Sequence, residues 1–234
     1  MPPDQPHPDV VDLTAAVSAR TDDLVRRLQS PGGPDEDRSG GFEHGGWMGR
    51  FVDEVFGEVV DGWFARTDAL LFGRHTYDVM ASYWPHVTDP KDATAARLNA
   101  APKHVVSRTL TPERATWNNT VEVIGDDVAE RIRALKASGE GNLQVHGSWR
   151  LIQALTEHGL VDEYHVIQFP TVVGAGKRLF DTGTPAGAFE VSDVRTTGTG
   201  AIAIVAAADP LPGGEPRGGR GARHRGVTGA RPGS

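Results

Sequence analysis

The chain has 234 residues, enough for one sizeable domain or for one domain with tails. It contains no cysteine, which excludes disulfides, thiolate nucleophiles, zinc sites built on cysteine and the zinc chemistry of the nucleobase deaminases. The net charge of −7 is uneven, because residues 211–234 carry +4 and the remainder carries −11. An acidic body is poorly suited to a nucleic-acid backbone, so we do not expect nucleic acid as a partner, although a local phosphate pocket is compatible with it.

The N-terminal part is the hardest to place. No run approaches the ~20 apolar residues that cross a bilayer, and MPPDQPHPDV has neither the basic start nor the apolar core of a signal peptide. We therefore expect a cytoplasmic protein with no membrane contact. Residues 1–28 are an atypical segment with rough helical spacing and no strand pattern, and residues 30–46, rich in glycine, proline and acids, predict a long loop.

From residue 47 onward, helical and strand patterns alternate. Residues 47–64 predict one amphipathic helix, because aromatic and valine residues recur at intervals of four. Further helices are predicted from Thr76 to before Pro85, over residues 126–138, and over 148–158 with Ser148 as its cap. Strands are predicted at 65–73, 103–107, 120–125, 142–147 and 162–174, followed by a hairpin at 189–208.

This order predicts an α/β fold with a mostly parallel central sheet flanked by helices and a C-terminal antiparallel hairpin. The domain is expected to cover residues 29–208. Residues 209–234, rich in glycine, proline and arginine, are expected to form a disordered tail.

A strand that ends in a small or polar residue and leads into a turn or helix occurs three times. The three junctions are Gly73-Arg74-His75-Thr76, Ser107-Arg108-Thr109 and His146-Gly147-Ser148. In an open α/β sheet, ligands bind outside the carboxyl ends of the strands, so these junctions can converge. Helix starts and arginine suit phosphate, and three such turns suit a dinucleotide. For each residue the alternative is an ordinary solvated turn, and His146 more often packs within a strand than donates protons.

Two further features limit this interpretation. No G-x-G-x-x-G pattern follows a strand, so the site would not be of the Rossmann type. The stretch GAGKR, residues 174–178, is a glycine-rich turn with two basic residues, which is weak support by itself.

Several of these segments together resemble one family. They are LLFGRHTYDVMASYWP, KHVVSRTL, NLQVHGSWRLIQALTEHGLVDEYHVIQFPTVVGAGKRLF and TTGTGAIAIV. The pattern is similar, over roughly residues 29–206, to the dihydrofolate reductase-like proteins related to the C-terminal reductase domain of the bifunctional riboflavin-biosynthesis deaminase-reductase. The resemblance implies a dihydrofolate reductase-like fold, NADPH as cofactor, and a pteridine-like or ribosylaminopyrimidine-like small molecule as substrate.

The resemblance also implies roles for individual residues. Gly73, Arg74, His75 and Thr76 would hold the cofactor phosphates, with Ser107 and Arg108 near the adenosine 2′-phosphate. Gly147, Ser148 and Trp149 would lie along the pyrophosphate and nicotinamide, and Gly174, Gly176 and Lys177 would line a turn beyond the sheet. The family usually begins with an apolar strand and a Ser-Leu-Asp-Gly turn. Here DDLVRRLQ precedes the loop instead, so we expect the sheet to lack that central strand.

The catalytic group is not identified by the sequence. Reduction of a C=N bond needs a proton donor, for which a carboxylic acid of raised pKa is suitable. Asp53 and Glu54 are weak candidates, and an ordinary solvated helix face is the alternative. No metal site is expected.

Other functions stay open. The chain could be a nucleotide-binding module that has lost turnover, a homodimer is compatible with the sequence, and the RGGRGARHR stretch would permit RNA binding, although no aromatic residue follows Phe189 to stack on bases.

Overall fold

The computed structural model describes residues 10–17, 28–138, 141–180 and 183–210. These residues form one eight-stranded sheet in the order β4-β3-β2-β5-β1-β6-β8-β7. The strands are β1 Val10–Val17, β2 Thr67–Gly73, β3 Lys103–Val106, β4 Thr120–Ile124, β5 Asn142–His146, β6 Glu163–Pro170, β7 Gly187–Thr196 and β8 Ile202–Pro210. The helices are α1 Glu54–Phe64, α2 Arg74–Tyr83, α3 Ala93–Ala100, α4 Val128–Ser138 and α5 Trp149–Glu157.

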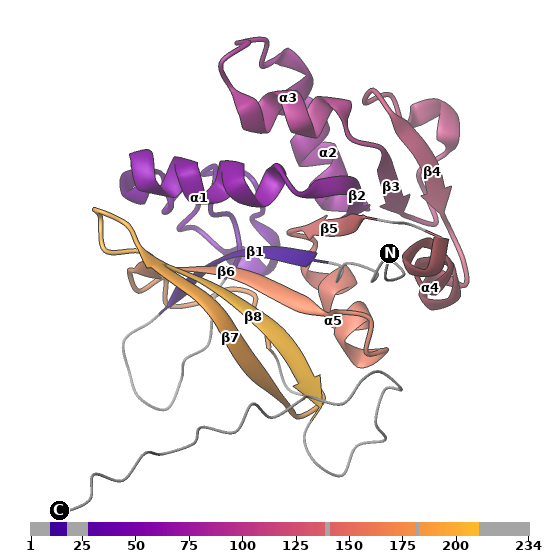
Figure 1. Cartoon of the computed structure of the whole chain (residues 1–234). Coiled ribbons are helices and arrows are strands. Elements are labelled where there is room, and N and C mark those ends of the chain that lie inside the picture. The colour runs from indigo at the N-terminus through magenta and orange to yellow at the C-terminus, as the bar shows by residue number, and fades with distance from the viewer. Residues whose placement is uncertain (1–9, 18–27, 139–140, 181–182, 211–234) are drawn as a thin grey trace, which may run out of the picture.

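The predicted architecture is confirmed. All strand pairs from β4 to β6 are parallel, and β8 and β7 extend the sheet as an antiparallel hairpin. Figure 1 shows α1, α2 and α3 on one side of the sheet and α4 and α5 on the other. Because both faces are covered, Leu70, Leu71 and Phe72 of β2 are all fully buried, which accounts for their unbroken apolar run.

The expectation of a missing central strand is wrong. Residues 10–17 form β1, which lies between β5 and β6 and pairs in parallel with both. Its register with β6 runs from Val10↔Glu163 to Val17↔Pro170. The sequence VVDLTAAV does not alternate cleanly, but a strand between two others gains its stability from ladder pairing, which local spacing does not reveal. Residues 1–9 and 18–27 of the segment predicted as helical lie outside the described residues.

The predicted helix over residues 47–64 begins later than expected. A short 3₁₀ turn covers Gly49–Phe51, Val52 is extended, and α1 starts at Glu54 with Asp53 as its N-cap. The aromatic residues before the helix still serve the core, because the rings of Trp47 and Phe51 lie 5.4 and 5.7 Å from that of Phe169. The apolar residues at intervals of four before Glu54 are therefore explained by their packing in the core and not by a helix.

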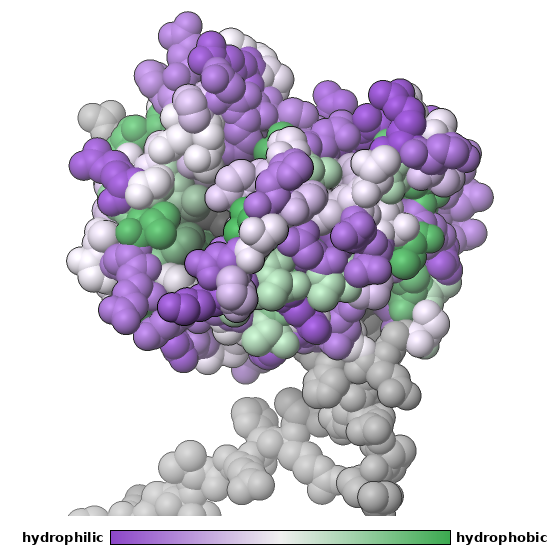
Figure 2. All heavy atoms as spheres, turned by 90° about the horizontal axis from the view of Figure 1, so that it is seen from above, coloured by the Kyte–Doolittle hydropathy of each residue, from purple (hydrophilic) through white to green (hydrophobic). Residues whose placement is uncertain are grey.

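The core is divided between the two faces of the sheet. On one face, α1 packs on β6 and β8, and the ends of β2 and β3 pack with α3 and Tyr77 of α2. On the other face, Ile132 of α4 and Leu151, Ile152 and Leu155 of α5 cover Leu71, Val145 and Val166. Seen from the α3 side, the surface is mostly hydrophilic, with apolar residues in small separate groups (Figure 2).

Within the described residues, no helix is long and apolar enough to cross a bilayer. The predicted tail falls almost wholly outside those residues, although β8 extends two residues past the expected boundary, to Pro210.

Candidate active site

The three predicted junctions lie at the carboxyl ends of neighbouring parallel strands. Gly73 is the last residue of β2, Ser107 follows β3, and Gly147 follows β5, in the sheet order β3-β2-β5. Two of the junctions are in direct contact, because the Gly73 N–H donates to the Ser148 hydroxyl oxygen at 2.7 Å. The starts of α2 and α5 therefore lie side by side.

Close approach of these two junctions depends on glycine. A Cβ built on Gly73 would stand 3.3 Å from the Ser148 side chain, and one on Gly147 would stand 3.4 Å from Thr76 Cγ2. Gly147 and Ser148 both have left-handed backbone, with φ of 60° and 67°. That conformation is costly for a serine, so the hydrogen bond to Gly73 helps to hold it.

The structure corrects one prediction here. Ser148 occupies the N-cap position of α5, but its side chain does not cap that helix and bonds Gly73 instead. The other helix start, at Gly73 and Arg74, has no side-chain cap either. Two adjacent helix N-termini thus present backbone N–H groups and the positive ends of their dipoles without a capping side chain.

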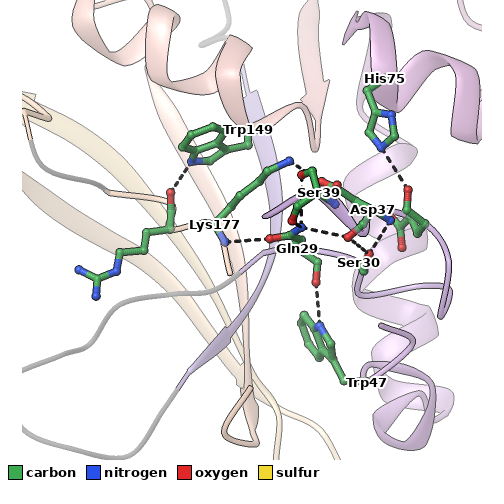
Figure 3. Close-up of polar contacts among 10 residues, drawn as sticks. Gln29, Ser30, Asp37, Ser39, Trp47, His75, Trp149 and Lys177 are labelled. Carbon is green, nitrogen blue, oxygen red and sulfur yellow. Dashed lines mark hydrogen bonds and ion pairs between the residues drawn. The ribbon is translucent and has the colours of Figure 1, made fainter. Parts of the chain in front are cut away.

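The loop predicted over residues 30–46 is organised by Gln29, which sequence reasoning missed. Its side chain is buried, and its Nε2 donates to the carbonyl oxygens of Asp37 and Ser39 at 3.0 and 2.9 Å. Its Oε1 accepts from the Lys177 N–H at 3.2 Å, and its own carbonyl accepts from Trp47 Nε1 at 2.9 Å (Figure 3). No local signal marks this glutamine, since one partner is 148 residues away.

The same loop reaches both helix starts. Asp37 forms an ion pair with the Lys177 ammonium group, which lies 5.6 Å from the centre of the Trp149 ring at the start of α5. Near the start of α2, His75 Nε2 donates to the Glu36 carbonyl oxygen at 3.1 Å. The loop therefore spans from α5 to α2, as the close-up shows (Figure 3).

The glycine-rich turn at residues 174–178 belongs to this assembly. Gly174 and Gly176 have φ of 76° and 119°, and a Cβ on Gly176 would meet Phe42 at 3.3 Å and Gln29 Oε1 at 3.4 Å. Trp149 Nε1 donates to the Arg178 carbonyl oxygen at 2.7 Å. The turn is thus packed between the loop and the first residue of α5.

Each cationic side chain expected to hold phosphate has an acidic or carbonyl partner. Arg74 pairs with Asp78 at 2.6 Å, one helical turn along α2, and Arg108 pairs with Asp126 at 3.5 Å. Burial raises the pKa of the Asp37 carboxyl, but hydrogen bonds from Lys177 and Ser39 outweigh it and hold that pKa below its usual value. Asp37 is therefore a carboxylate at neutral pH.

The second junction is set apart from the other two. The Ser107 hydroxyl oxygen accepts from the N–H groups of Thr109 and Leu110 at 3.2 and 3.0 Å, which closes a turn after β3. Arg108 is largely exposed, and its partner Asp126 follows β4. In the sheet, β4 lies beside β3 on the side opposite to β2. The structure brings the first and third junctions together and leaves Arg108 at the outer side of the crevice.

The weak catalytic candidates lie at the start of α1. Asp53 caps the helix by accepting from the Phe56 N–H at 2.8 Å, and it also accepts from the Thr199 N–H at 2.9 Å in the turn between β7 and β8. The hydrogen bond from Phe56 lowers the pKa of Asp53, burial opposes this, and hydrogen bonds from Thr199 and Gly198 lower it further, so that the pKa lies below its usual value. A proton donor needs the opposite shift. Glu54 is the first residue of α1 and is exposed.

His146 packs against Phe64, with ring centres 5.5 Å apart. Within the part of the chain that the structure describes, no group of three or more His, Asp or Glu side chains is arranged to hold a metal ion.

This combination of a mostly parallel sheet and an antiparallel hairpin at one edge defines a dihydrofolate reductase-like fold. The family model of the RibD C-terminal domain matches residues 40–203, and the chain belongs to this reductase-like family.

Individual proteins are also similar to this chain. An uncharacterised protein of Bacillus subtilis, YyaP, is 29% identical over 140 residues, which cover 59% of this chain and 72% of that protein. A crystal structure of a putative riboflavin biosynthesis protein from Shewanella has a TM-score of 0.59 at 20% identity, covering 87% of this chain and 99% of the other. A pyrimidine reductase-like protein from Corynebacterium diphtheriae has a TM-score of 0.55 at 13% identity, covering 86% and 92%. These two structures support the assignment of the fold.

Proposed function

We propose that the chain is an NADPH-dependent reductase of a pteridine-like or ribosylaminopyrimidine-like small molecule. The observation that carries the proposal is the contact between Gly73 and Ser148, which sets two helix starts side by side at the carboxyl ends of β2 and β5. Membership of the RibD C-terminal domain family supports a reductase.

The residues at this crevice fit the phosphates of a dinucleotide. Two helix starts without side-chain caps supply N–H donors, and Gly73 and Gly147 let these two helix starts lie close together. Arg74 and Lys177 supply cations from either side. Their present partners are the carboxylates of Asp78 and Asp37. A phosphate group also offers anionic oxygen acceptors, so it can take the place of these carboxylates as the partner of Arg74 and Lys177.

NADPH, when bound, supplies the hydride. The chain's own residues bind and orient it: residues 73–76 and 147–149 take the pyrophosphate and nicotinamide side, and Ser107 and Arg108 take the 2′-phosphate. Gly174, Gly176 and Lys177 close the site from the turn that Gln29 holds. We assign no proton donor, because Asp53 is held as an anion by the N–H groups that it caps.

Titration of cofactor fluorescence with NADPH and NADH tests the proposal on the full chain. A charge-assisted contact contributes roughly 1.5–3 kcal/mol, so Arg108→Ala, at the 2′-phosphate, is expected to weaken NADPH binding by about tenfold to a hundredfold, with a much smaller effect on NADH. Arg74→Ala, at the pyrophosphate that both cofactors share, is expected to weaken both. The matched control is Arg133→Ala on the exposed face of α4, which is expected to bind both cofactors as the wild type does. Equal weakening of both cofactors by Arg108→Ala would contradict the assignment of the 2′-phosphate.

One observation favours a second function, a nucleotide-binding module without turnover. The carboxyl group best placed to be considered as an acid, Asp53, has a lowered pKa and serves as a helix cap. Oxidation of NADPH, followed by absorbance in the presence of an aminopyrimidine ribitol compound or a pterin, separates the two. Tight NADPH binding without oxidation in any such mixture would favour the binding module.

A further inference from the structure

A cavity of about 300 Å³ lies between the second half of α1 and the strands β6, β8 and β7. It reaches the amino end of β6, since Glu163 is both the first residue of that strand and part of the cavity wall. The candidate cofactor crevice lies at the carboxyl ends of strands parallel to β6. The cavity and the crevice are therefore at opposite ends of the sheet.

The charges around this cavity are not equivalent. Glu58, Arg66, Asp193 and Arg195 are exposed residues at its rim, and Asp193 and Arg195 already pair with each other at 3.5 Å. Water and salt screen such exposed charges. The Glu163 side chain is only 15% exposed, so its carboxylate is the charge that a ligand inside the cavity would meet at short range.

A buried histidine holds two walls of the cavity in place. His165 is fully buried, its Nε2 donates to Glu163 Oε1 at 2.6 Å, and its ring centre lies 4.8 Å from that of Trp63. The hydrogen bond from His165 lowers the pKa of Glu163 despite its burial, with a further contribution from the Arg66 charge. The other ring nitrogen, Nδ1, is buried and has no partner among the described residues. The carboxylate and the indole are thus fixed before any ligand arrives.

A glycine keeps the cavity open. Gly62 lies in the interior of α1, where glycine is less favourable than alanine, and it lines the cavity. A Cβ built on Gly62 would have no atom within 4 Å. Gly57 in the same helix has equally open space around its Cβ position but does not line the cavity, so it provides a matched control.

We propose that this cavity binds a small organic ammonium compound, with the charged nitrogen beside the Glu163 carboxylate and the apolar part of the ligand on the Trp63 ring. The ammonium group donates a charge-assisted hydrogen bond to the carboxylate, and the apolar part of the ligand packs on the indole. The volume of about 300 Å³ is at the lower end for ligand pockets and suits a compact amine. The site is separate from the proposed reductase crevice and does not depend on that function.

Calorimetric titration of the full chain with phenethylammonium chloride tests the proposal, with 2-phenylethanol as the uncharged probe of the same shape. Phenethylammonium is expected to bind at least about tenfold more tightly than the alcohol, the difference that a charged hydrogen bond provides. Gly62→Leu is expected to abolish binding by filling the cavity, while Gly57→Leu binds as the wild type does. Glu163→Gln, which keeps an acceptor for His165, is expected to remove the preference for the charged probe.

Equal binding of the two probes, no binding of phenethylammonium, or full binding by Gly62→Leu would each overturn the proposal. If Gly62→Leu does not fold, Glu163→Gln decides the question. NADPH titrations of the same variants keep this test independent, since all of them are expected to bind NADPH as the wild type does.

Discussion

The backbone N–H of Gly73 donates to the hydroxyl oxygen of Ser148 at 2.7 Å, across strand ends that are 75 residues apart in the sequence. The bond joins the starts of α2 and α5 and holds Ser148 in a left-handed conformation. Two substitutions separate these effects. Ser148→Ala keeps the unfavourable conformation and loses the bond, whereas Ser148→Gly loses the bond but tolerates the conformation.

We therefore expect Ser148→Ala to lower the free energy of unfolding by about 1–2 kcal/mol. Ser148→Gly is expected to stay within about 1 kcal/mol of the wild type, because relief of backbone strain offsets the lost bond. Urea unfolding of both variants measures the difference. An alanine variant as stable as the glycine variant would mean that the left-handed conformation costs nothing here.

The ion pair between Asp37 and Lys177 predicts a pH dependence. The pKa of Asp37 is lowered in the folded chain, so the unfolded state binds a proton first as the pH falls. The stability that Asp37 contributes is thus present above its ordinary pKa of about 4 and is lost as the pH falls through the lower, folded value.

Asp37→Asn is expected to unfold at lower urea than the wild type at pH 7, with a difference that shrinks below about pH 4. Unfolding curves at several pH values measure it. Because Asp37 competes for a cation at the crevice, the variant is also expected to bind NADPH more tightly. A constant difference in stability across the pH range would show that the carboxylate charge does not contribute.

Asp53 gives a prediction about the start of α1. Asparagine caps a helix about as well as aspartate, whereas alanine does not. Asp53→Asn keeps the cap but has only one oxygen, so it loses the acceptor for Thr199 and is expected to unfold slightly below the wild type; Asp53→Ala loses both contacts and is expected to unfold at clearly lower temperature. Thermal unfolding by circular dichroism measures both. If Asp53→Asn keeps its stability but loses NADPH oxidation, Asp53 has a catalytic role in addition to the cap.

Lys103 predicts a change at alkaline pH. Its side chain is fully buried, its Nζ donates to the carbonyl oxygens of Asn99, Ala101 and Asn118, and it lies 4.6 Å from the centre of the Trp117 ring. Burial lowers the pKa of Lys103 to about 8. The folded state therefore loses its proton before the unfolded state does, and stability contributed by this group rises from about pH 8 to about pH 10.5.

Lys103→Met removes this rise and takes one donor from three carbonyl oxygens, of which that of Ala101 is in a buried contact. The variant is expected to unfold at lower urea at pH 7, and the gap from the wild type is expected to widen toward pH 10. Urea unfolding at pH 7, 8.5 and 10 checks the trend. A gap that stays constant would mean that the carbonyl groups hold the lysine charged over this pH range, and a gap that narrows would mean that they raise its pKa; either result contradicts the expected lowering.

Much of the fold follows from local pattern. A strand buried on both faces appears in the sequence as a short apolar run, as at Leu70, Leu71 and Phe72, followed here by a glycine. A helix appears as a repeated spacing of apolar residues. Both patterns can be recognised within a short stretch of sequence. The three strand ends were recognisable for the same reason, and the parallel sheet then places them on one edge.

What the tertiary structure decided is where distant segments meet. Residues 10–17 become a strand through their ladders to β5 and β6, and Ser148 bonds Gly73 rather than its own helix. Gln29 holds the loop to Lys177, 148 residues away. Hydrogen bonds of this kind depend on which groups face each other after the chain has folded, and such pairing has no signature in the neighbouring sequence.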